Sequence, residues 1–158
     1  IERAKMRVFC KMQDDILHPA IQNPTFNLLV KPQLSKKSDE ELEEWLSTHP
    51  LEKSRKLFQG AARGPVNNEA LEEAKTQFNF VFNRMEEALT ETEWLSGSTY
   101  SLADIACAPI LDRLGQCEWL DLFSPFPKLS SWGEKIRERE AFKAMRPKDE
   151  QRLGNWDS

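Results

Sequence analysis

The sequence has few residues that could fix a fold covalently. It contains three cysteines, Cys10, Cys107 and Cys117, and none of them forms a CxxC pair. Because three cysteines cannot all pair, we expect neither a disulfide framework nor a metal site, and we expect a reducing, cytoplasmic compartment. Cys107 lies in an apolar stretch and is expected to be a small buried side chain.

Basic patches and long apolar runs are also missing. The formal net charge is −4, and Lys and Arg alternate with Glu in stretches such as "KIREREAFK", which is typical of a solvated helix face. No apolar run approaches the roughly 18 residues that a membrane span needs. We therefore expect no signal peptide and neither nucleic acid nor a membrane as a partner.

Motifs of self-contained catalysis are absent from the sequence. It has no GxSxG, HExxH, Walker or dinucleotide-binding fingerprint, and no stretch alternates apolar and polar residues as a half-buried strand does. The sequence thus predicts an all-α fold in which no catalytic residue is identified. The chain begins at Ile1 with a helical pattern and no cap. We therefore expect it to be an excerpt from which an N-terminal partner domain has been removed.

Apolar residues at helical spacing predict about five main helices. The first covers residues 1–17, and His18-Pro19 should kink or end it. Ser38 and Glu41 have the spacing of a capping box before a short acidic helix. The longest helix follows Asn67-Asn68, and a last amphipathic helix uses Leu129, Trp132, Ile136 and Phe142.

The stretch "STYSLADIACAPILDRL" predicts a capped helix that is apolar nearly all round and hence central. With Ser101 as N-cap, its hydroxyl can accept from the N–H of Asp104, and the Asp104 carboxylate can accept from the N–H of Ser101. Tyr100 and Ile105 then occupy the two positions of a hydrophobic staple. These four residues are interpreted as structural capping residues, and Asp104 as a folding device rather than a catalyst.

Three motifs in this order resemble the C-terminal domain of glutathione transferases. "EWLSG…YSLADIACAPIL" is similar to the entry of that family's sixth helix, and "FPKLSSWGEKIREREAFKAM" to its final helix. "RAKMRVFCKMQDD" is similar to its fourth helix. Within the family, the "SDEELEE" insertion resembles bacterial enzymes that cleave β-aryl ethers, and the last third resembles beta- and zeta-class enzymes.

The resemblance implies that residues 1–158 form a C-terminal helical domain without its thioredoxin-like N-terminal domain. In this family the absent domain binds glutathione and carries the residue that stabilises the thiolate. The helical domain supplies a hydrophobic pocket for a small, aromatic electrophile and much of a homodimer surface. The resemblance thus implies a full-length enzyme whose helical part alone is inactive.

The resemblance also assigns three substrate-binding positions. The pocket-facing position of the fourth helix corresponds to His18, and Gln22 follows one turn later. A sixth-helix position that often holds a tryptophan corresponds to Arg113, whose guanidinium would favour a carboxylate or phenolate on the electrophile. The alternatives are that His18 only ends a helix and that Arg113 is a surface residue paired with Asp112 or Glu118.

A different class of function stays open beside this one. A transferase-like module can also be kept for binding other proteins without catalysis, because a fold does not fix a function.

Overall fold

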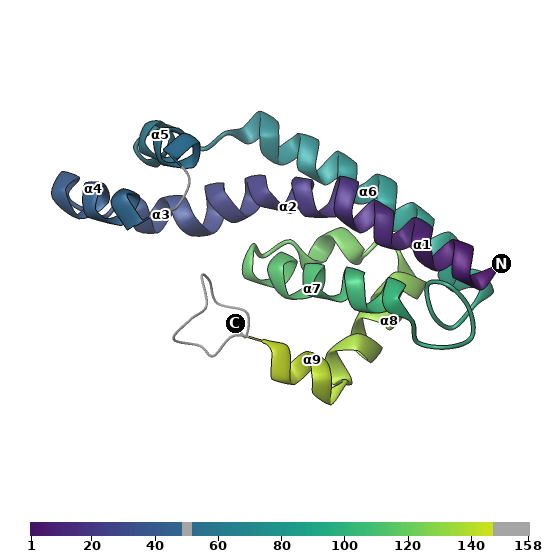
Figure 1. Ribbon diagram of the computed structural model, residues 1–158. Coiled ribbons are helices and arrows are strands. Elements are labelled where there is room, and N and C mark those ends of the chain that lie inside the picture. Colours follow the sequence, from purple (N-terminus) through teal and green to yellow (C-terminus); the bar gives the residue numbers. More distant parts are fainter. Residues whose placement is uncertain (49–51, 147–158) are drawn as a thin grey trace.

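The computed structural model describes residues 1–48 and 52–146, and every regular element in these ranges is helical. The order is α1 (Glu2–Met12), α2 (His18–Pro24), α3 (Lys31–Leu34), α4 (Asp39–Thr48), α5 (Glu52–Ala62), α6 (Asn68–Glu91), α7 (Leu102–Gln116), α8 (Pro127–Glu138) and α9 (Glu140–Met145). A 3₁₀ turn, η3 (Leu120–Phe123), precedes α8. The prediction of an all-α bundle is confirmed (Figure 1).

The first three helices form one continuous rod. Two π-helical segments, η1 (Gln13–Leu17) and η2 (Thr25–Val30), join them, and the backbone stays in the α region at each junction. His18-Pro19 therefore does not end the first helix, and that alternative of the prediction is wrong. A proline ring clashes with the carbonyl four residues earlier in a regular α-helix, and the wider π turn directly before His18 lets the rod continue.

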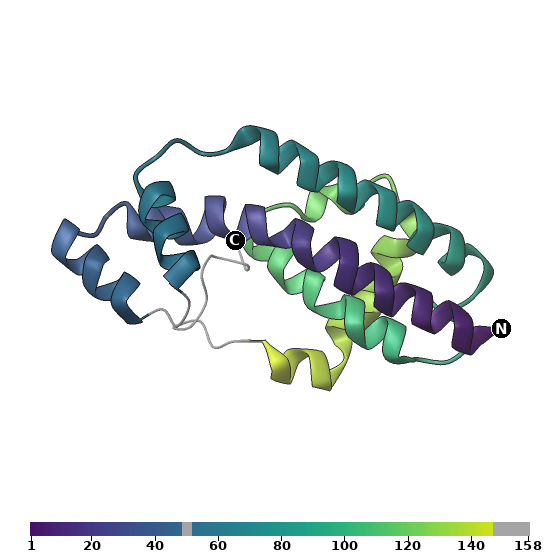
Figure 2. The same ribbon diagram turned by 45° about the horizontal axis from the view of Figure 1, so that its top comes forward.

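Helix α6 lies along this rod (Figures 1 and 2). The Asn67 side chain caps it by accepting from the Ala70 N–H at 3.1 Å. Its buried face consists of the residues that the periodicity predicts, Leu71, Ala74, Phe78, Val81, Phe82, Met85 and Leu89. The Phe82 ring packs edge-on against Phe123, 4.8 Å between centroids, so α6 also holds the segment that leads into α8.

Helix α7 crosses between the rod and α8 and contributes much of the main core. Cys107, Leu111 and Leu114 on α7 are buried against that core, and so are Leu129 and Ile136 on α8. The expectation of a buried Cys107 is confirmed. Helix α7 is nevertheless not buried all round, because Leu102 and Ile105 are 58% and 50% exposed.

A second, separate apolar cluster lies at the far end of the rod. It joins Leu34, Leu42, Leu46 and Ala62, with the Phe26 and Phe58 rings stacked at 5.1 Å. Helices α4 and α5 thus pack on α3 and η2 rather than on the main core. Figure 2 shows them at the end of the molecule opposite the N-terminus.

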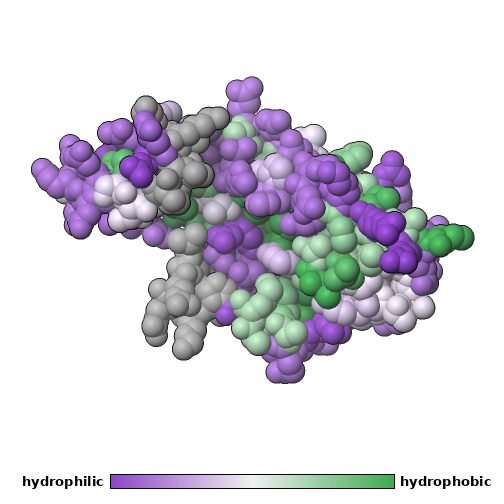
Figure 3. Space-filling view, viewed as in Figure 1, coloured by the Kyte–Doolittle hydropathy of each residue, from purple (hydrophilic) through white to green (hydrophobic). Residues whose placement is uncertain are grey.

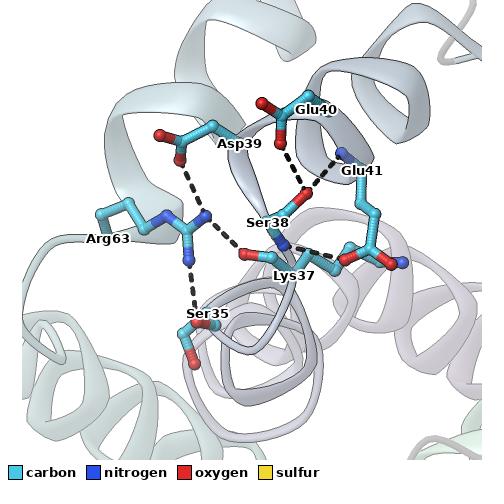
Figure 4. A network of polar contacts seen from close by, with 7 residues as sticks. All are labelled: Ser35, Lys37, Ser38, Asp39, Glu40, Glu41 and Arg63. Atoms are coloured by element: carbon cyan, nitrogen blue, oxygen red, sulfur yellow. Dashed lines mark hydrogen bonds and ion pairs between the residues drawn. The ribbon is translucent and has the colours of Figure 1, made fainter.

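Polar contacts at the α3–α4 turn hold helices α4 and α5 together (Figure 4). The Arg63 guanidinium donates to the carbonyl oxygens of Ser35 and Lys37 at 2.8 and 2.6 Å, and to Asp39 Oδ1 at 3.0 Å. The capping box predicted at Ser38 and Glu41 is present, with reciprocal hydrogen bonds of 2.8 and 3.2 Å. One arginine therefore ties the end of α5 to the start of α4.

Candidate functional site

The start of α7 is built around two polar side chains, the half-buried Ser101 and the buried Asp104. Ser101 is the N-cap, its hydroxyl accepts from the Ala103 N–H at 3.2 Å, and the reciprocal capping box with Asp104 is present. The Asp104 carboxylate accepts from the N–H and the hydroxyl of Ser101, both at 2.9 Å. These contacts satisfy donors that a helix N-terminus otherwise leaves open.

Asp104 has two further partners from outside its helix. Its Oδ1 accepts from the Leu95 N–H at 3.1 Å and from Trp132 Nε1 at 3.0 Å. The side chain is completely buried, so it reaches no cleft or substrate. Its geometry is that of a structural tether between the loop before α7 and helix α8.

Tyr100 and Ile105, the two positions of the predicted staple, have different surroundings. The Tyr100 ring packs edge-on against Trp94 at 5.1 Å, with the Arg139 guanidinium 3.7 Å from its centroid. Ile105 has half of its surface in solvent. The staple between them stays a prediction.

The outer face of α7 is apolar and open. Leu102, Ile105, Ala106 and Pro109 follow one line along the helix, and none of them is buried. Figure 3 shows hydrophobic surface gathered over α7 and α9 on the face that Figure 1 presents. The apolar pattern predicts a central helix, yet within the described residues this side of α7 is not buried.

Arg113 continues that line at the C-terminal half of α7 and is half-buried. Its Nη1 donates to Gln116 Oε1 at 3.4 Å. Asp112 instead accepts from Gln116 Nε2 at 2.6 Å and pairs with Arg146 at 3.4 Å. The pairing of Arg113 with Asp112 or Glu118 is therefore absent from the ion pairs of the described residues.

His18 and Gln22 lie together on the exposed side of α2, with His18 Nε2 and Gln22 Nε2 3.4 Å apart. Helix α2 packs against α7, which places the two helices that carry the predicted substrate residues side by side. Within its described part, the structure shows no direct contact between Arg113 and His18 or Gln22. The polar contacts present are between His18 and Gln22, and between Arg113 and Gln116.

The buried thiols are poor nucleophiles. Burial raises the pKa of Cys107 to about 12, with a smaller contribution from the Asp104 charge, and burial raises the pKa of Cys117 to about 11. Since the thiolate is the reactive form, neither cysteine is suited to attack an electrophile near neutral pH. All three cysteines are free.

A second open surface lies between α1 and α6. It is a groove of about 650 Å³ whose apolar lining includes Val8, Phe9, Met12 and Phe80, edged by Lys5, Arg84, Glu87 and Glu91. Val8 and Phe80 are each 51% exposed. Sequence reasoning missed this surface, although Phe80 falls outside the buried face of its helix, which is a signal that could have revealed it.

Two other kinds of site are not found in the described residues. No group of three or more His, Cys, Asp or Glu side chains there could hold a metal ion. Within the same ranges, no helix has the length and apolar character to cross a membrane.

Comparison with known proteins gives one consistent family. Residues 17–140 match the family described as "Glutathione S-transferase, C-terminal domain". Protein LigF of Sphingobium sp. is 27% identical over 93% of this chain, which spans 64% of LigF. The disulfide-bond oxidoreductase YfcG of Escherichia coli is 32% identical over 46% of this chain and 33% of its own length.

Solved structures agree with that match. The crystal structure of the β-etherase LigF superposes with a TM-score of 0.74 at 30% identity, covering 91% of this chain and 61% of LigF. Glutathione transferase F7 of Populus trichocarpa gives a TM-score of 0.64 at 22% identity, over 90% of this chain and 54% of the transferase. The likeness to glutathione transferase F7 shows that this chain has the same fold.

Proposed function

The chain belongs to the glutathione S-transferase family through its C-terminal domain, and we propose that it forms the electrophile-binding part of a glutathione-dependent enzyme. In this proposal residues 1–158 are the helical domain, and glutathione is bound mainly by a thioredoxin-like domain. In the proposal the full-length enzyme acts in the cytoplasm, where free thiols such as these persist.

The reaction we propose is glutathione-dependent cleavage of an aryl ether. Conjugation of glutathione to another aromatic electrophile would use the same thiolate and the same binding residues. The observation that carries this proposal is the likeness to the β-etherase LigF, which extends over 91% of the chain in structure. The glutathione thiolate attacks the carbon that bears the ether oxygen. A C–S bond forms, the C–O bond breaks, and the aryl oxygen leaves with the bonding electron pair and then takes up a proton.

The chemistry of this chain's residues supports a reaction in which glutathione supplies the nucleophile and the helical domain binds the electrophile. Its buried thiols hold their protons, because burial raises the pKa of Cys107 to about 12, so the nucleophile is expected to come with glutathione. In the proposal, the exposed apolar residues Leu102, Ile105 and Pro109 on α7 face the thioredoxin-like domain and, further along the helix, an aromatic ring. His18 and Gln22 would line the α2 side, where His18 can protonate the leaving oxygen.

The groove between α1 and α6 is our candidate for the homodimer surface. Its exposed Val8 and Phe80 give it an apolar centre, and charges of both signs edge it. An apolar centre with a polar rim is the usual anatomy of a protein interface, and the same surface on two copies can pair about a two-fold axis.

The experiment is a turnover assay on the protein that carries this chain together with its thioredoxin-like domain. A β-aryl ether is incubated with and without glutathione, and release of the phenol is followed by chromatography. We expect release that requires glutathione and falls in His18→Ala, while exposed Lys128→Ala serves as the matched surface control. If the folded two-domain protein consumes neither ethers nor other aryl electrophiles, the interaction-module interpretation replaces the enzymatic one.

A further inference from the structure

We propose that Arg3 and Arg7 on α1 bind a carboxylate of glutathione from the side of the helical domain. The inference rests on the proposed function, because it requires a full-length protein that binds glutathione. It adds one contact from this chain to a ligand that the thioredoxin-like domain holds for the most part. Three observations support it: the charge of α1, the lack of partners for two of its arginines, and the side of the helix on which they lie.

Helix α1 is positively charged in a chain that is negative as a whole. It carries Arg3, Lys5, Arg7 and Lys11 against the single acid Glu2, whereas the net charge of the chain is −4. Glutathione is an anion with two carboxylates and one ammonium group, and its thiolate adds a further negative charge. The net charge of the chain repels such a ligand, and a local excess of positive charge attracts it. The charge of α1 therefore suits an anionic ligand.

Two of these four cations have no partner in the described part of the chain. Lys5 and Lys11 are each paired with a carboxylate, at 3.1 and 2.7 Å. Arg3 and Arg7 are exposed and make no hydrogen bond or ion pair with any described residue. Their guanidinium groups are open to an acceptor from outside the chain, and a guanidinium can donate two parallel hydrogen bonds to one carboxylate.

Arg3 and Arg7 share one side of α1, away from the groove toward α6. They are four residues apart, so their side chains are neighbours with a rise of about 6 Å between them. Lys5, Val8 and Met12 line the groove, and helical spacing puts these three on roughly the opposite side of the helix from the two arginines. The arginines therefore lie outside the surface that we propose for the homodimer.

The side of α1 that bears the arginines adjoins the open face of α7. Helix α1 packs on α7. Burial is the main cause of the raised pKa of Cys107 on α7, and Asp104 and Cys10 add to it, which places Cys10 on the α7 side of α1. Cys10 follows Arg7 by three residues and is its neighbour on the helix surface. Figure 3 shows strongly hydrophilic side chains along α1 next to the hydrophobic surface over α7, the face that we propose for the thioredoxin-like domain.

The two contacts add affinity to a site that the other domain builds. Water and salt weaken an exposed pair of a guanidinium and a carboxylate, so each contact is expected to strengthen binding by about three- to fivefold. Two contacts of that strength do not hold glutathione on the helical domain alone. The chain by itself is thus expected to remain without bound glutathione at millimolar concentration.

The test is isothermal titration of glutathione into the protein that carries this chain together with its thioredoxin-like domain, without an electrophile. Arg3→Gln and Arg7→Gln should each raise the Kd about three- to fivefold, and the double variant about tenfold or more. Arg7→Lys should keep most of the affinity, because lysine keeps the charge and loses the parallel pair of hydrogen bonds. Lys128→Gln, which removes an exposed charge elsewhere, is the matched control and should leave the Kd unchanged.

A second ligand identifies the carboxylate. Glutathione monoethyl ester lacks the glycine carboxylate. If the wild type and the double variant bind the ester equally, the arginines hold that group; if the difference between them persists, they hold the γ-glutamyl carboxylate. Added salt should weaken glutathione binding more in the wild type than in the double variant.

The outcomes separate this inference from the proposed function. The same Kd in the wild type and in a double variant that circular dichroism shows to be folded overturns the inference and leaves the proposed function standing. An equal rise in Lys128→Gln also overturns the inference, because any lost charge would then have the same effect. A wild-type two-domain protein that binds no glutathione overturns both.

Discussion

The indole Nε1 of Trp132 donates a hydrogen bond of 3.0 Å to Oδ1 of Asp104, and 28 residues separate the two in sequence. The same carboxylate caps α7 through Ser101 and accepts from the Leu95 N–H. A residue that starts one helix therefore also fixes the position of a second helix. This tether, more than any catalytic group, explains why an aspartate stands beside the apolar run of α7.

Asp104→Ala should lower the free energy of unfolding by about 3 kcal/mol or more, because several buried donors lose a charged acceptor. Ser101→Ala should cost about 1 kcal/mol, as for other N-cap serines. Urea titration followed by tryptophan fluorescence measures both, with the exposed Asp121→Ala as control. Wild-type stability in Asp104→Ala would show that the carboxylate is not a tether.

Arg63→Ala should loosen α4 and α5 without loosening the main core. The guanidinium holds two carbonyl oxygens and Asp39 at the α3–α4 turn, and the apolar cluster there is separate from the core around α6 and α7. Hydrogen exchange measured by mass spectrometry should rise in α4 and α5 alone. Arg84→Ala, which removes an exposed ion pair with Glu87, should leave the exchange pattern unchanged.

Phe80→Glu should convert a dimer of this chain into a monomer. Phe80 is 51% exposed in the groove between α1 and α6, and a charge there would have to be buried at the interface without a partner. Light scattering coupled to gel filtration measures the mass. Leu102→Glu is the matched control, since it changes an equally exposed apolar residue on α7; a monomeric wild type, or a dimeric Phe80→Glu, would contradict the proposed surface.

Cys107 and Cys117 should resist alkylation at pH 8, whereas the partly exposed Cys10 should react. Iodoacetamide labelling with peptide mass spectrometry tells the three apart, and labelling of Cys107 in the native chain at that pH would contradict the buried site.

The same burial has a consequence at alkaline pH. Because the pKa of Cys107 rises from 9.0 to about 12 on folding, the unfolded chain loses this proton first as pH increases. The contribution to stability is complete below pH 9 and declines above it by about 1.4 kcal/mol per pH unit. Urea titrations between pH 8 and 10 should show wild type losing stability relative to Cys107→Ala, and parallel pH profiles would be inconsistent with the shift.

Local patterns determine the parts of the fold that the sequence predicts well. The buried face of α6 and the capping boxes at Ser38 and Ser101 each depend on residues within one or two turns. Such signals depend on neighbouring residues and little on the rest of the chain. The structure shows these elements at the positions that the spacing indicates.

Features that depend on distant parts of the chain could not be predicted in this way. Proline chemistry predicts a kink or an end of the first helix at His18-Pro19, but a π turn keeps the rod continuous. The apolar pattern places Leu102 and Ile105 on a central helix, whereas in the described part of the chain they are 58% and 50% exposed. The positions of His18, Gln22 and Arg113 as substrate residues stay a prediction, because their roles depend on a ligand and not on local geometry.

The central claim is that this chain holds the electrophile and leaves glutathione to another domain. Isothermal titration of the chain with glutathione, and separately with a neutral β-aryl ether, tests it most directly. We expect heat of binding from the aromatic ether and none from glutathione up to millimolar concentration. Micromolar binding of glutathione, with no binding of the ether, would contradict the account.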